Sequence, residues 1–260
     1  MADSRLKTYL EAWKQEEREP FTGWDFSYLE GRMIEDQPPW SYPSRAAELM
    51  GTSSAVLDMG TGGGERLLRF RPNWPDLVVV TEDYAPNVRL AGARLIPQGA
   101  SVVEVPLERT KSLPFADGSF DLVLNRHSGL SCAEVARVLA PGGAFLTQQI
   151  HGLWAQDLLA AFGARPQWPD ATPELYGPCL TRAGLVVERL EDWRGELVFT
   201  DVGALVYYLK AVPWLVPGFS VDTHLDSLLR LQSEIEREGR LVFEARKYLI
   251  EARKPAGNVG

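Results

Sequence analysis

A glycine-rich segment that begins at residue 60 is the part of the sequence with the clearest chemistry. An apolar run ends at Asp58, and four glycines then fall within five residues, at Gly60, Gly62, Gly63 and Gly64. Glycine lets a backbone adopt positive φ and lets a ligand approach without a Cβ in the way. A helix-like segment begins directly after the last glycine. The pattern predicts a strand, a tight turn and a helix, which place a ligand beyond the carboxyl end of the sheet.

Three kinds of ligand loop compete for this segment. A Walker phosphate loop needs Gly-Lys-Ser/Thr after its glycines, whereas Glu65-Arg66-Leu67 follows here. A dinucleotide fingerprint would have Glu65 in its third glycine position, and an acid that opens the helix would repel a pyrophosphate. A glycine turn that serves packing alone is the alternative without a ligand. The frame that fits is Asp-x-Gly-x-Gly-x-Gly, at Asp58, Gly60, Gly62 and Gly64.

This frame resembles the first motif of the class I S-adenosylmethionine-dependent methyltransferases, which follows the first strand of their sheet. The resemblance implies that S-adenosyl-L-methionine is the cofactor and S-adenosyl-L-homocysteine the product. It also implies that the loop wraps the amino-acid part of the cofactor, whose ammonium and sulfonium groups suit an acidic loop. The cofactor-binding residues that it predicts here are Asp58, Gly60, Thr61, Gly62 and Gly64.

A second acidic position lies at the end of the next apolar run, where Thr81 is followed by Glu82 and Asp83. A carboxylate at a strand tip can accept hydrogen bonds from two ribose hydroxyls. In the resembled family an acidic residue at this tip has that role. Glu82 matches the position best, and Asp83 takes it if the strand runs one residue longer. A solvated loop acid is the alternative without a ligand.

Two later segments follow the order of the same family. Residues 113–121 read Leu-Pro-Phe-Ala-Asp-Gly-Ser-Phe-Asp and resemble the segment that enters the fourth strand in many small-molecule members. Residues 140–143, Ala-Pro-Gly-Gly, resemble the turn before the fifth strand. The family often has an acid about four residues before the first of these segments, which binds the adenine amino group, but this chain has Arg109 there. Backbone groups of Leu107, Glu108 and Arg109 are therefore the predicted adenine contacts.

The end of the fourth strand is the predicted catalytic segment. Methyl transfer from a sulfonium is an in-line displacement, so the site must hold an acceptor atom behind the methyl carbon and exclude water. In the resembled family, residues after strand four face the reactive methyl group. His127 titrates near neutral pH and is a candidate general base, with helix capping or packing as its other role. Asn125 is suited to orient the substrate or the cofactor carboxylate, and Arg126 to pair with an anionic substrate group.

The tip of the fifth strand offers further polar groups for an acceptor pocket. Side chains alternate along a strand, so only one of Gln148 and Gln149 is expected to face the site. His151 is a further candidate base or a surface residue. The sequence contains no Asn-Pro-Pro-Tyr or Asp-Pro-Pro-Tyr, a tetrapeptide associated with methylation of amino groups on bases and glutamine. Its absence argues against those acceptors.

Aromatic side chains are the expected walls of the substrate pocket. Trp24 and Phe26 lie in a stretch that resembles the cap ahead of the first strand in some bacterial members, although the same rings could simply anchor the N-terminal arm. Tyr207 lies in residues 201–238, which suit either a pocket wall or a dimer face.

Nearly continuous apolar runs alternate with helix-like segments from residue 54 onward, as strands buried on both faces of a parallel sheet do. The seven predicted strands are 55–58, 77–81, 101–105, 120–124, 143–147, 185–190 and 247–252. The predicted helices are 6–19, 44–50, 66–70, 87–95, 132–139, 154–162, 173–183, 201–211 and 223–238. The expected fold class is α/β, a doubly wound, mostly parallel seven-stranded sheet of the Rossmann-like methyltransferase type.

The domain organisation follows from where these elements fall. We expect a helical and aromatic N-terminal cap in residues 1–50. The S-adenosylmethionine-dependent methyltransferase domain then takes 51–260, with its core motifs in 54–150. A helical insertion at about 195–246 precedes the last strand.

Composition limits the partners of the protein. The chain has 27 basic and 35 acidic residues, a net charge of −8, and an acidic protein repels a phosphate backbone. The N-terminus lacks the apolar run of a signal peptide, and Gly203–Val221 is interrupted by Lys210, Pro213 and Pro217, which makes it a poor membrane span. Two cysteines make no disulfide framework and no CxxC pair, and no residue cluster has metal-ligand spacing.

These features together favour a cytoplasmic methyltransferase, monomeric or homodimeric, that acts on a small or medium organic molecule. We expect neither nucleic acid nor a membrane as a partner, and we expect no bound metal. Two alternatives stay open at this stage. One is transfer to RNA or protein, and the other is a non-catalytic protein that only binds S-adenosylmethionine.

Overall fold

The chain divides into two compact units, which are described separately. A computed structural model describes residues 2–21, 25–105 and 112–257. The core unit comprises residues 39–151, 171–193 and 247–260. The accessory unit comprises residues 1–38, 152–170 and 194–246. The predicted boundary at residue 50 stays a prediction.

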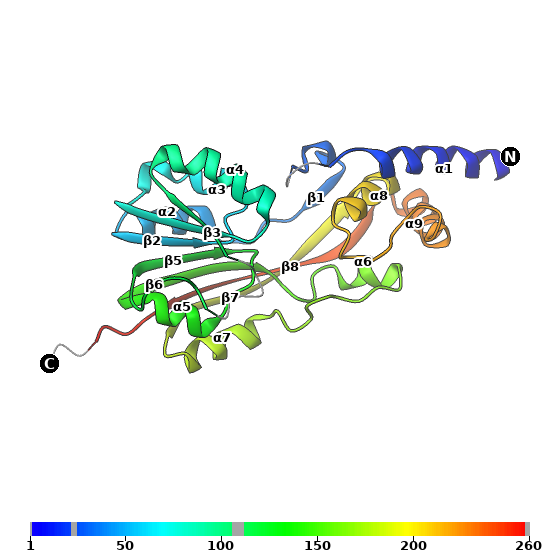
Figure 1. Ribbon diagram of the computed structural model, residues 1–260. Coiled ribbons are helices and arrows are strands. Elements are labelled where there is room, and N and C mark those ends of the chain that lie inside the picture. The colour runs from blue at the N-terminus through cyan, green and yellow to red at the C-terminus, as the bar shows by residue number, and fades with distance from the viewer. Residues whose placement is uncertain (1, 22–24, 106–111, 258–260) are drawn as a thin grey trace. The chain divides into compact units, whose positions relative to one another are not determined.

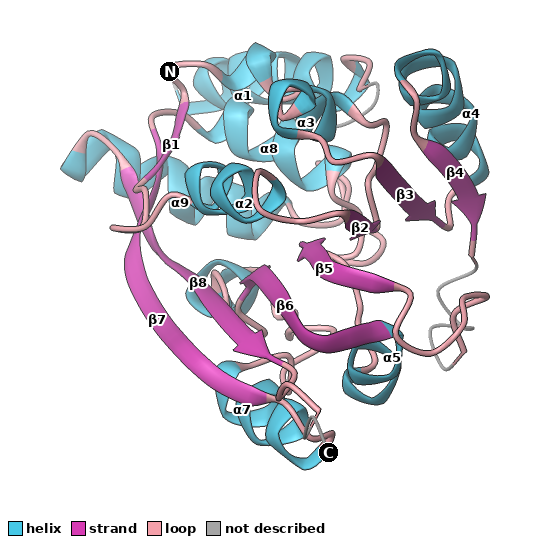
Figure 2. Ribbon diagram, turned by 90° about the vertical axis from the view of Figure 1, so that its left-hand side faces the viewer, coloured by secondary structure: helices cyan, strands magenta, loops and turns pink. Residues whose placement is uncertain are grey.

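The apolar runs of the core unit form one twisted sheet (Figure 1). Its strands lie in the order β7-β8-β6-β5-β2-β3-β4, and the four pairs among β6, β5, β2, β3 and β4 are all parallel. Strand β8 pairs with β6 in the antiparallel sense. The strands are β2 (Ala55–Met59), β3 (Leu77–Glu82), β4 (Ser101–Glu104), β5 (Phe120–Arg126), β6 (Leu139–Ile150), β7 (Val186–Phe199) and β8 (Leu241–Arg253). Figure 2 shows the succession of these strands from the side.

Helices cover both faces of the core sheet, which is why its strands are apolar on both sides. Helices α2, α3 and α4 pack on one face, and α5 and α7 on the other (Figure 1). On β2, Val56 points into the first cluster and Leu57 into the second, and both are fully buried. The helices are α2 (Tyr42–Met50), α3 (Glu65–Leu68), α4 (Ala85–Leu95), α5 (Cys132–Val138) and α7 (Pro173–Arg182).

Side-chain caps set where three of these helices begin. Ser41, Ser131 and Thr172 each accept a hydrogen bond from the backbone amide three residues later, which satisfies one of the free amides of a helix start. The predicted start of α2 at Ser44 is therefore wrong, because Ser41 is the cap and Pro43 is tolerated in the first turn.

The sheet has one strand more than the seven predicted. The eighth is β1 (Met33–Glu35), which lies in the accessory unit and pairs antiparallel with residues 197–199 of β7. Its three residues carry no alternation long enough to be recognised in the sequence. Strand β7 also runs nine residues beyond its predicted end at residue 190. Exposed and partly buried residues alternate over residues 186–196, and the last three residues are buried.

Cys132 on α5 and Cys179 on α7 form a disulfide in the core unit, with 6.0 Å between their Cα atoms. The sequence did not predict this disulfide, because two cysteines 47 residues apart make no recognisable spacing pattern. Only the packing of two helices on the same face of the sheet brings these thiols together.

The accessory unit is mainly helical. Its helices are α1 (Ala2–Arg18), α6 (Gln156–Ala161), α8 (Val202–Ala211) and α9 (Leu225–Glu238). Arg32 donates to Glu16 on α1 and to Asp201, the cap of α8, at 2.7 Å each, so it joins the two helices to β1. Among the described residues, no helix has the length and hydrophobicity needed to cross a bilayer.

Candidate active site

The glycine loop joins β2 to α3 and has three residues with positive φ. Gly60, Gly62 and Gly64 have φ of 68°, 64° and 83°. A Cβ on Gly60 would lie 2.3 Å from Oγ of Ser128, and one on Gly64 would lie 2.8 Å from the side chain of Leu95. These two glycines are therefore required both by conformation and by space. The turn is held by the amides of Gly60 and Thr61, which both donate to the carbonyl of Thr81 at 3.0 Å.

Glu82 lies at the tip of β3 and is tied to the glycine loop. Its Oε2 accepts from the amide of Gly62 at 2.7 Å, and its Oε1 accepts from the amide of Tyr84 at 3.1 Å. The residue is only 5% exposed, and burial raises the pKa of its carboxyl although the two amides oppose that effect. A carboxylate has about four acceptor sites, so both oxygens keep capacity for further donors.

Asp58 lies in β2, one residue before Met59, at which the strand ends. Desolvation raises the pKa of Asp58 to about 6, and the nearby Glu82 acts in the same direction. The hydroxyl of Thr61 and the guanidinium of Arg66 oppose the shift. Because desolvation disfavours the charged form of this carboxyl, a cationic ligand beside it would stabilise that form.

These elements surround a small, open hollow at the carboxyl ends of β2, β3 and β5. Its lining includes predicted residues from the loop and from the tip of β3, together with residues that the sequence did not single out. The lining residues are Met59, Gly60, Thr81, Glu82, Asp83, Val105, Leu113, Ser128 and Gly129. Parallel strands with a ligand crevice beyond their carboxyl ends are the expected geometry for an open α/β sheet.

Asn125 lies at the end of β5, fully buried and opposite Met59 in the sheet register. Its Oδ1 accepts from Oγ1 of Thr147 at 2.9 Å and from Nε2 of Gln149. Gln149 also donates to the carbonyl of Ser128 at 3.1 Å. In the described part of the chain, Nδ2 of Asn125 is a buried donor without a hydrogen-bond partner. A ligand oxygen beside it would satisfy that donor.

His127 follows β5 with φ of 54°, a left-handed backbone that is uncommon for a residue other than glycine. Its amide donates to the carbonyl of Gln148 at 3.0 Å. Desolvation lowers the pKa of His127 well below 6.5, and three nearby cations act in the same direction. They are Arg126, Lys247 and Arg66. His127 does not cap α5, because Ser131 does.

The two glutamines at the tip of β6 differ as expected from strand alternation. Gln148 contacts the ring of His127, with 3.4 Å between its Nε2 and Nε2 of the histidine, whereas Gln149 joins the buried network of Asn125. Both are buried. His151 is 3% exposed and packs edge to face on Tyr248, so its alternative role as a surface residue is wrong.

Several predicted site residues are not among the residues of this cluster. Leu107, Glu108, Arg109 and Trp24 lie outside the described residues. Phe26 and Tyr207 belong to the accessory unit, where they pack on other rings. Phe26 lies 5.7 Å from Tyr208, and Tyr207 lies 4.6 Å from Tyr28, measured between ring centroids. Their assignment to a substrate pocket stays a prediction.

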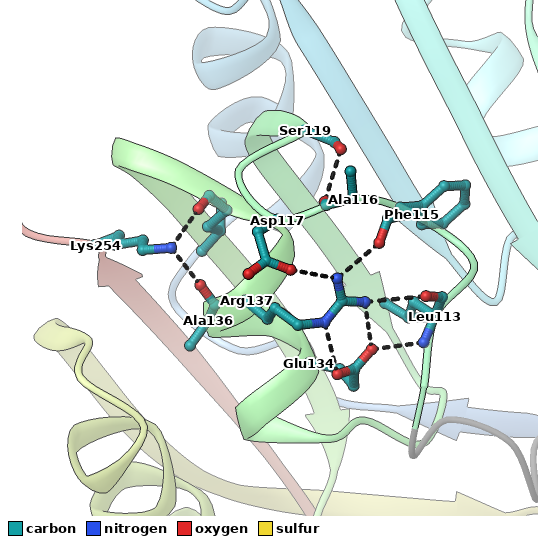
Figure 3. Close-up of polar contacts among 10 residues, drawn as sticks. Leu113, Phe115, Ala116, Asp117, Ser119, Glu134, Ala136, Arg137 and Lys254 are labelled. Atoms are coloured by element: carbon teal, nitrogen blue, oxygen red, sulfur yellow. Dashed lines mark hydrogen bonds and ion pairs between the residues drawn. The ribbon is translucent and has the colours of Figure 1, made fainter.

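Arg137 on α5 holds the segment that enters β5 (Figure 3). It donates to the carbonyls of Leu113 and Phe115 at 3.0 and 2.7 Å, and forms ion pairs with Asp117 and Glu134. Glu134 accepts in turn from the amide of Leu113 at 2.6 Å. Leu113 lines the hollow, so this network shapes the site from outside it. Its sequence signal was weak, because Arg137 is 20 residues or more from each of the loop groups that it binds.

Comparison with known proteins agrees with this geometry. Residues 57–147, which contain the glycine loop, the tip of β3 and the end of β5, match the family model of a methyltransferase domain. Residues 57–147 therefore belong to a methyltransferase domain, as the resemblance to the class I S-adenosylmethionine-dependent methyltransferases predicted. S-adenosylmethionine is the cofactor of that family, and the predicted fold and family are thereby confirmed.

Individual relatives of the methyltransferase domain are distant. The chain is 30% identical over 145 residues to a 23S rRNA (guanine(748)-N(1))-methyltransferase of Streptomyces fradiae and spans 50% of that protein. It is 24% identical over 147 residues to ribosomal RNA small subunit methyltransferase G of Chlorobium phaeobacteroides and spans 66% of it. These matches cover 54% and 53% of the present chain.

A solved structure supports the fold over more of the chain. The structure of a proposed methyltransferase from Bacillus halodurans C-125 superposes with a TM-score of 0.59 at 18% identity. The match covers 82% of this chain and 97% of that one. At this identity the likeness concerns the fold of the methyltransferase domain and carries nothing about its acceptor.

Proposed function

We propose that the protein transfers a methyl group from S-adenosylmethionine to a small or medium organic molecule. The observation that carries the proposal is the glycine loop, whose Gly62 amide is bonded to the buried carboxylate of Glu82 beside an open hollow. In this loop a Cβ on Gly60 or Gly64 would collide with the protein, and the loop has no lysine to hold a phosphate.

The residues present fit the cofactor. The loop from Gly60 to Gly64 gives close backbone approach at the carboxyl end of the sheet. Glu82 retains acceptor capacity for the two ribose hydroxyls. Asp58 carries a charge that desolvation makes costly, and a cationic ammonium group would stabilise it. When bound, S-adenosylmethionine supplies an electrophilic methyl group on a sulfonium.

The residues at the ends of β5 and β6 would form the acceptor side of the site. Asn125 has a buried donor to offer to an oxygen. Arg126 and His127 follow it along the chain, and Gln148 lies beside His127. We assign these residues to holding the acceptor in line and to excluding water, which is the main requirement of a displacement at carbon.

RNA is the second candidate acceptor, because both curated relatives are named for methylation of ribosomal RNA. The charge of −8 argues against it, since a surface of this sign repels a phosphate backbone. A non-catalytic cofactor-binding protein is a third possibility. These candidates share the cofactor site and differ in what receives the methyl group.

Calorimetric titration with S-adenosylmethionine and S-adenosylhomocysteine tests the cofactor site. We expect micromolar binding by the full chain. Glu82→Gln removes the charged acceptor of the ribose and should weaken the affinity by roughly tenfold to a hundredfold. Glu104→Gln is the matched control, because Glu104 is paired with Glu82 in the register of β3 and β4 but is exposed outside the hollow lining. No heat of binding from the folded wild type would refute the proposal.

Transfer of a labelled methyl group identifies the acceptor. The protein is incubated with labelled cofactor and, in separate reactions, with metabolite extract, total RNA and protein extract. Label in the metabolite fraction supports the proposal. Label in RNA would favour the second candidate, and binding without transfer to any fraction would favour the third.

A further inference from the structure

A chain of polar contacts links Trp40, Gln148 and His127 at the edge of the site. Nε1 of Trp40 donates to Oε1 of Gln148 at 2.9 Å, and both side chains are buried. On its other side Gln148 presents Nε2 to Nε2 of His127 at 3.4 Å. His127 directly precedes Ser128 and Gly129, which line the hollow.

The donors in this chain decide where the histidine proton lies. An indole N–H only donates, so the atom of Gln148 that faces Trp40 must be the carbonyl oxygen. The amide nitrogen then faces His127, and it too only donates. Nε2 of His127 must therefore accept, and a neutral imidazole with an accepting Nε2 carries its proton on Nδ1.

The surroundings of His127 favour the neutral ring. Arg126 ends β5 directly before His127, Lys247 comes from β8, and Arg66 comes from α3. All three cations disfavour a second proton on the ring, in agreement with the lowered pKa. A doubly protonated ring would also set two N–H donors against each other at Gln148.

Nδ1 is the nitrogen left for a ligand. Within residues 25–105 and 112–257, the only hydrogen bonds of His127 are the ring contact at Nε2 and the backbone bond to Gln148. The left-handed backbone at His127 has a conformational cost, and such strain is found at functional sites when the surroundings hold it.

We propose that Trp40 and Gln148 are positioning residues that lock His127 as the neutral Nδ1–H tautomer. We further propose that His127 donates this hydrogen to a carboxylate or carbonyl oxygen of the methyl acceptor. The second statement rests on the proposed function. It replaces the expected general base with a hydrogen-bond donor, because the only unprotonated nitrogen of the ring is occupied by Gln148. The acceptor atom must then enter the site already unprotonated, with its lone pair free to attack the methyl carbon.

Nitrogen NMR of the imidazole rings tests the tautomer in the full chain without any ligand. The protein has three histidines, so comparison with His127→Gln assigns the signals of His127. At neutral pH we expect Nδ1 with the shift of a protonated nitrogen and Nε2 with that of an unprotonated one. A protonated Nε2, or an equal mixture of tautomers, overturns the lock.

Substitutions at Gln148 separate the lock from a merely structural role. In Gln148→Glu one carboxylate oxygen still accepts from Trp40, and the other can only accept from the ring. We expect the proton to move to Nε2 and the pKa of His127 to rise by roughly 1–3 units. Gln98→Glu, an exposed position, adds the same charge elsewhere and should leave the tautomer unchanged. If Gln148→Glu does not fold, Trp40→Phe, which frees the amide to turn, should give mixed tautomers. An unchanged tautomer in a folded variant overturns the proposal.

A carboxylate probe tests the donor role of Nδ1. The protein saturated with S-adenosylhomocysteine is titrated with benzoate and, separately, with benzylammonium, which has no lone pair to offer. We expect benzoate alone to move the Nδ1 signal, and Gln148→Glu to abolish the response. No response to benzoate overturns the donor role. Calorimetry of S-adenosylhomocysteine in the same samples shows independently whether the proposed function stands.

Discussion

At the scale of single residues, the two acids of the site are prepared in different ways. Glu82 is held by two backbone amides, that of Gly62 in the glycine loop and that of Tyr84 after β3, and each fixes one oxygen. Asp58 is desolvated, and its pKa is raised to about 6. One acid is thus positioned, and the other is left with a charge that a cation would stabilise.

The raised pKa of Asp58 predicts a pH dependence of cofactor affinity. Above about pH 6 the carboxylate is ionised and attracts the ammonium group, and below it the group takes up a proton. The affinity for S-adenosylmethionine should therefore fall as the pH drops from 7 toward 5, by calorimetry. Asp58→Asn should bind weakly with no such slope. A slope of equal size in Asp58→Asn would contradict the assignment.

For the stability of the folded protein, the raised pKa of Asp58 predicts the opposite pH dependence: stability falls as the pH rises. A folded-state pKa of about 6 exceeds the ordinary value of 3.8, so the ionised form is disfavoured in the folded state. Stability is lost as the pH rises between these values. Asp58→Asn should be more stable than the wild type to urea at pH 7, and this difference should vanish below pH 4. A less stable variant at pH 7 would contradict the desolvation argument.

A side chain at Gly60 should clash with Ser128, and a second substitution at Ser128 should relieve the clash. Gly60→Ala should cost about 1–2 kcal/mol for its positive φ and about 1–3 kcal/mol more for the collision with Ser128. Gly99→Ala is the control, because Gly99 also has positive φ but nothing within 4 Å of the added carbon. Adding Ser128→Gly to Gly60→Ala should recover the second part. Denaturant unfolding measures all four proteins, and equal losses in the two alanine variants would exclude the clash.

At the scale of elements, helix α5 shapes the site through Arg137. The guanidinium binds the carbonyls of Leu113 and Phe115 and lowers the pKa of Glu134, the residue that receives the amide of Leu113. One helix thereby sets the course of the segment that enters β5.

Loss of Arg137 should disturb both folding and cofactor binding. Arg137→Ala leaves the buried Glu134 without its cation and two carbonyls without a donor, so we expect a loss of about 1–3 kcal/mol in unfolding free energy. The affinity for S-adenosylhomocysteine should fall with it, since Leu113 lines the hollow. Arg189→Ala removes an exposed pair with Glu191 and should change neither quantity. If Arg137→Ala binds S-adenosylhomocysteine as tightly as the wild type, the Arg137 network does not shape the cofactor site.

The disulfide between α5 and α7 predicts a stability that depends on redox conditions. Closing a loop with a sequence separation of 47 residues should stabilise the oxidised protein by roughly 3–4 kcal/mol in the chain-entropy description. The midpoint of denaturant unfolding should fall on addition of a reductant. The variant with both Cys132→Ser and Cys179→Ser should show no such response. An equal response in that variant would exclude the disulfide as its cause.

At the scale of the whole molecule, charge bears on the acceptor. The net charge of −8 predicts weak, salt-sensitive binding to RNA. In a filter assay at about 0.15 M salt we expect no retention of labelled ribosomal RNA at protein concentrations that saturate with cofactor. Retention at that salt would show a local basic surface and would favour the RNA methyltransferases among its relatives.

The amino-acid sequence determined the order and nature of the core elements. Five parallel strands follow from continuous apolar runs, and the crevice at their carboxyl ends follows from four glycines behind Asp58. These signals are local, because a buried strand and a tight turn each impose residue types over a few adjacent positions. The positions of Glu82 at the end of β3, and of Asn125 and His127 at the end of β5, follow from the same apolar runs.

Tertiary structure decided what depends on residues far apart in the chain. The pairing of Cys132 with Cys179 needs two helices on one face of the sheet. The tautomer inferred for His127 needs Trp40 and Gln148, which lie 87 and 21 residues away in the chain. The short strand β1 exists because β7 extends far enough to pair with it. No local pattern encodes such contacts, since their free energy appears only once the sheet has brought the partners within hydrogen-bond distance.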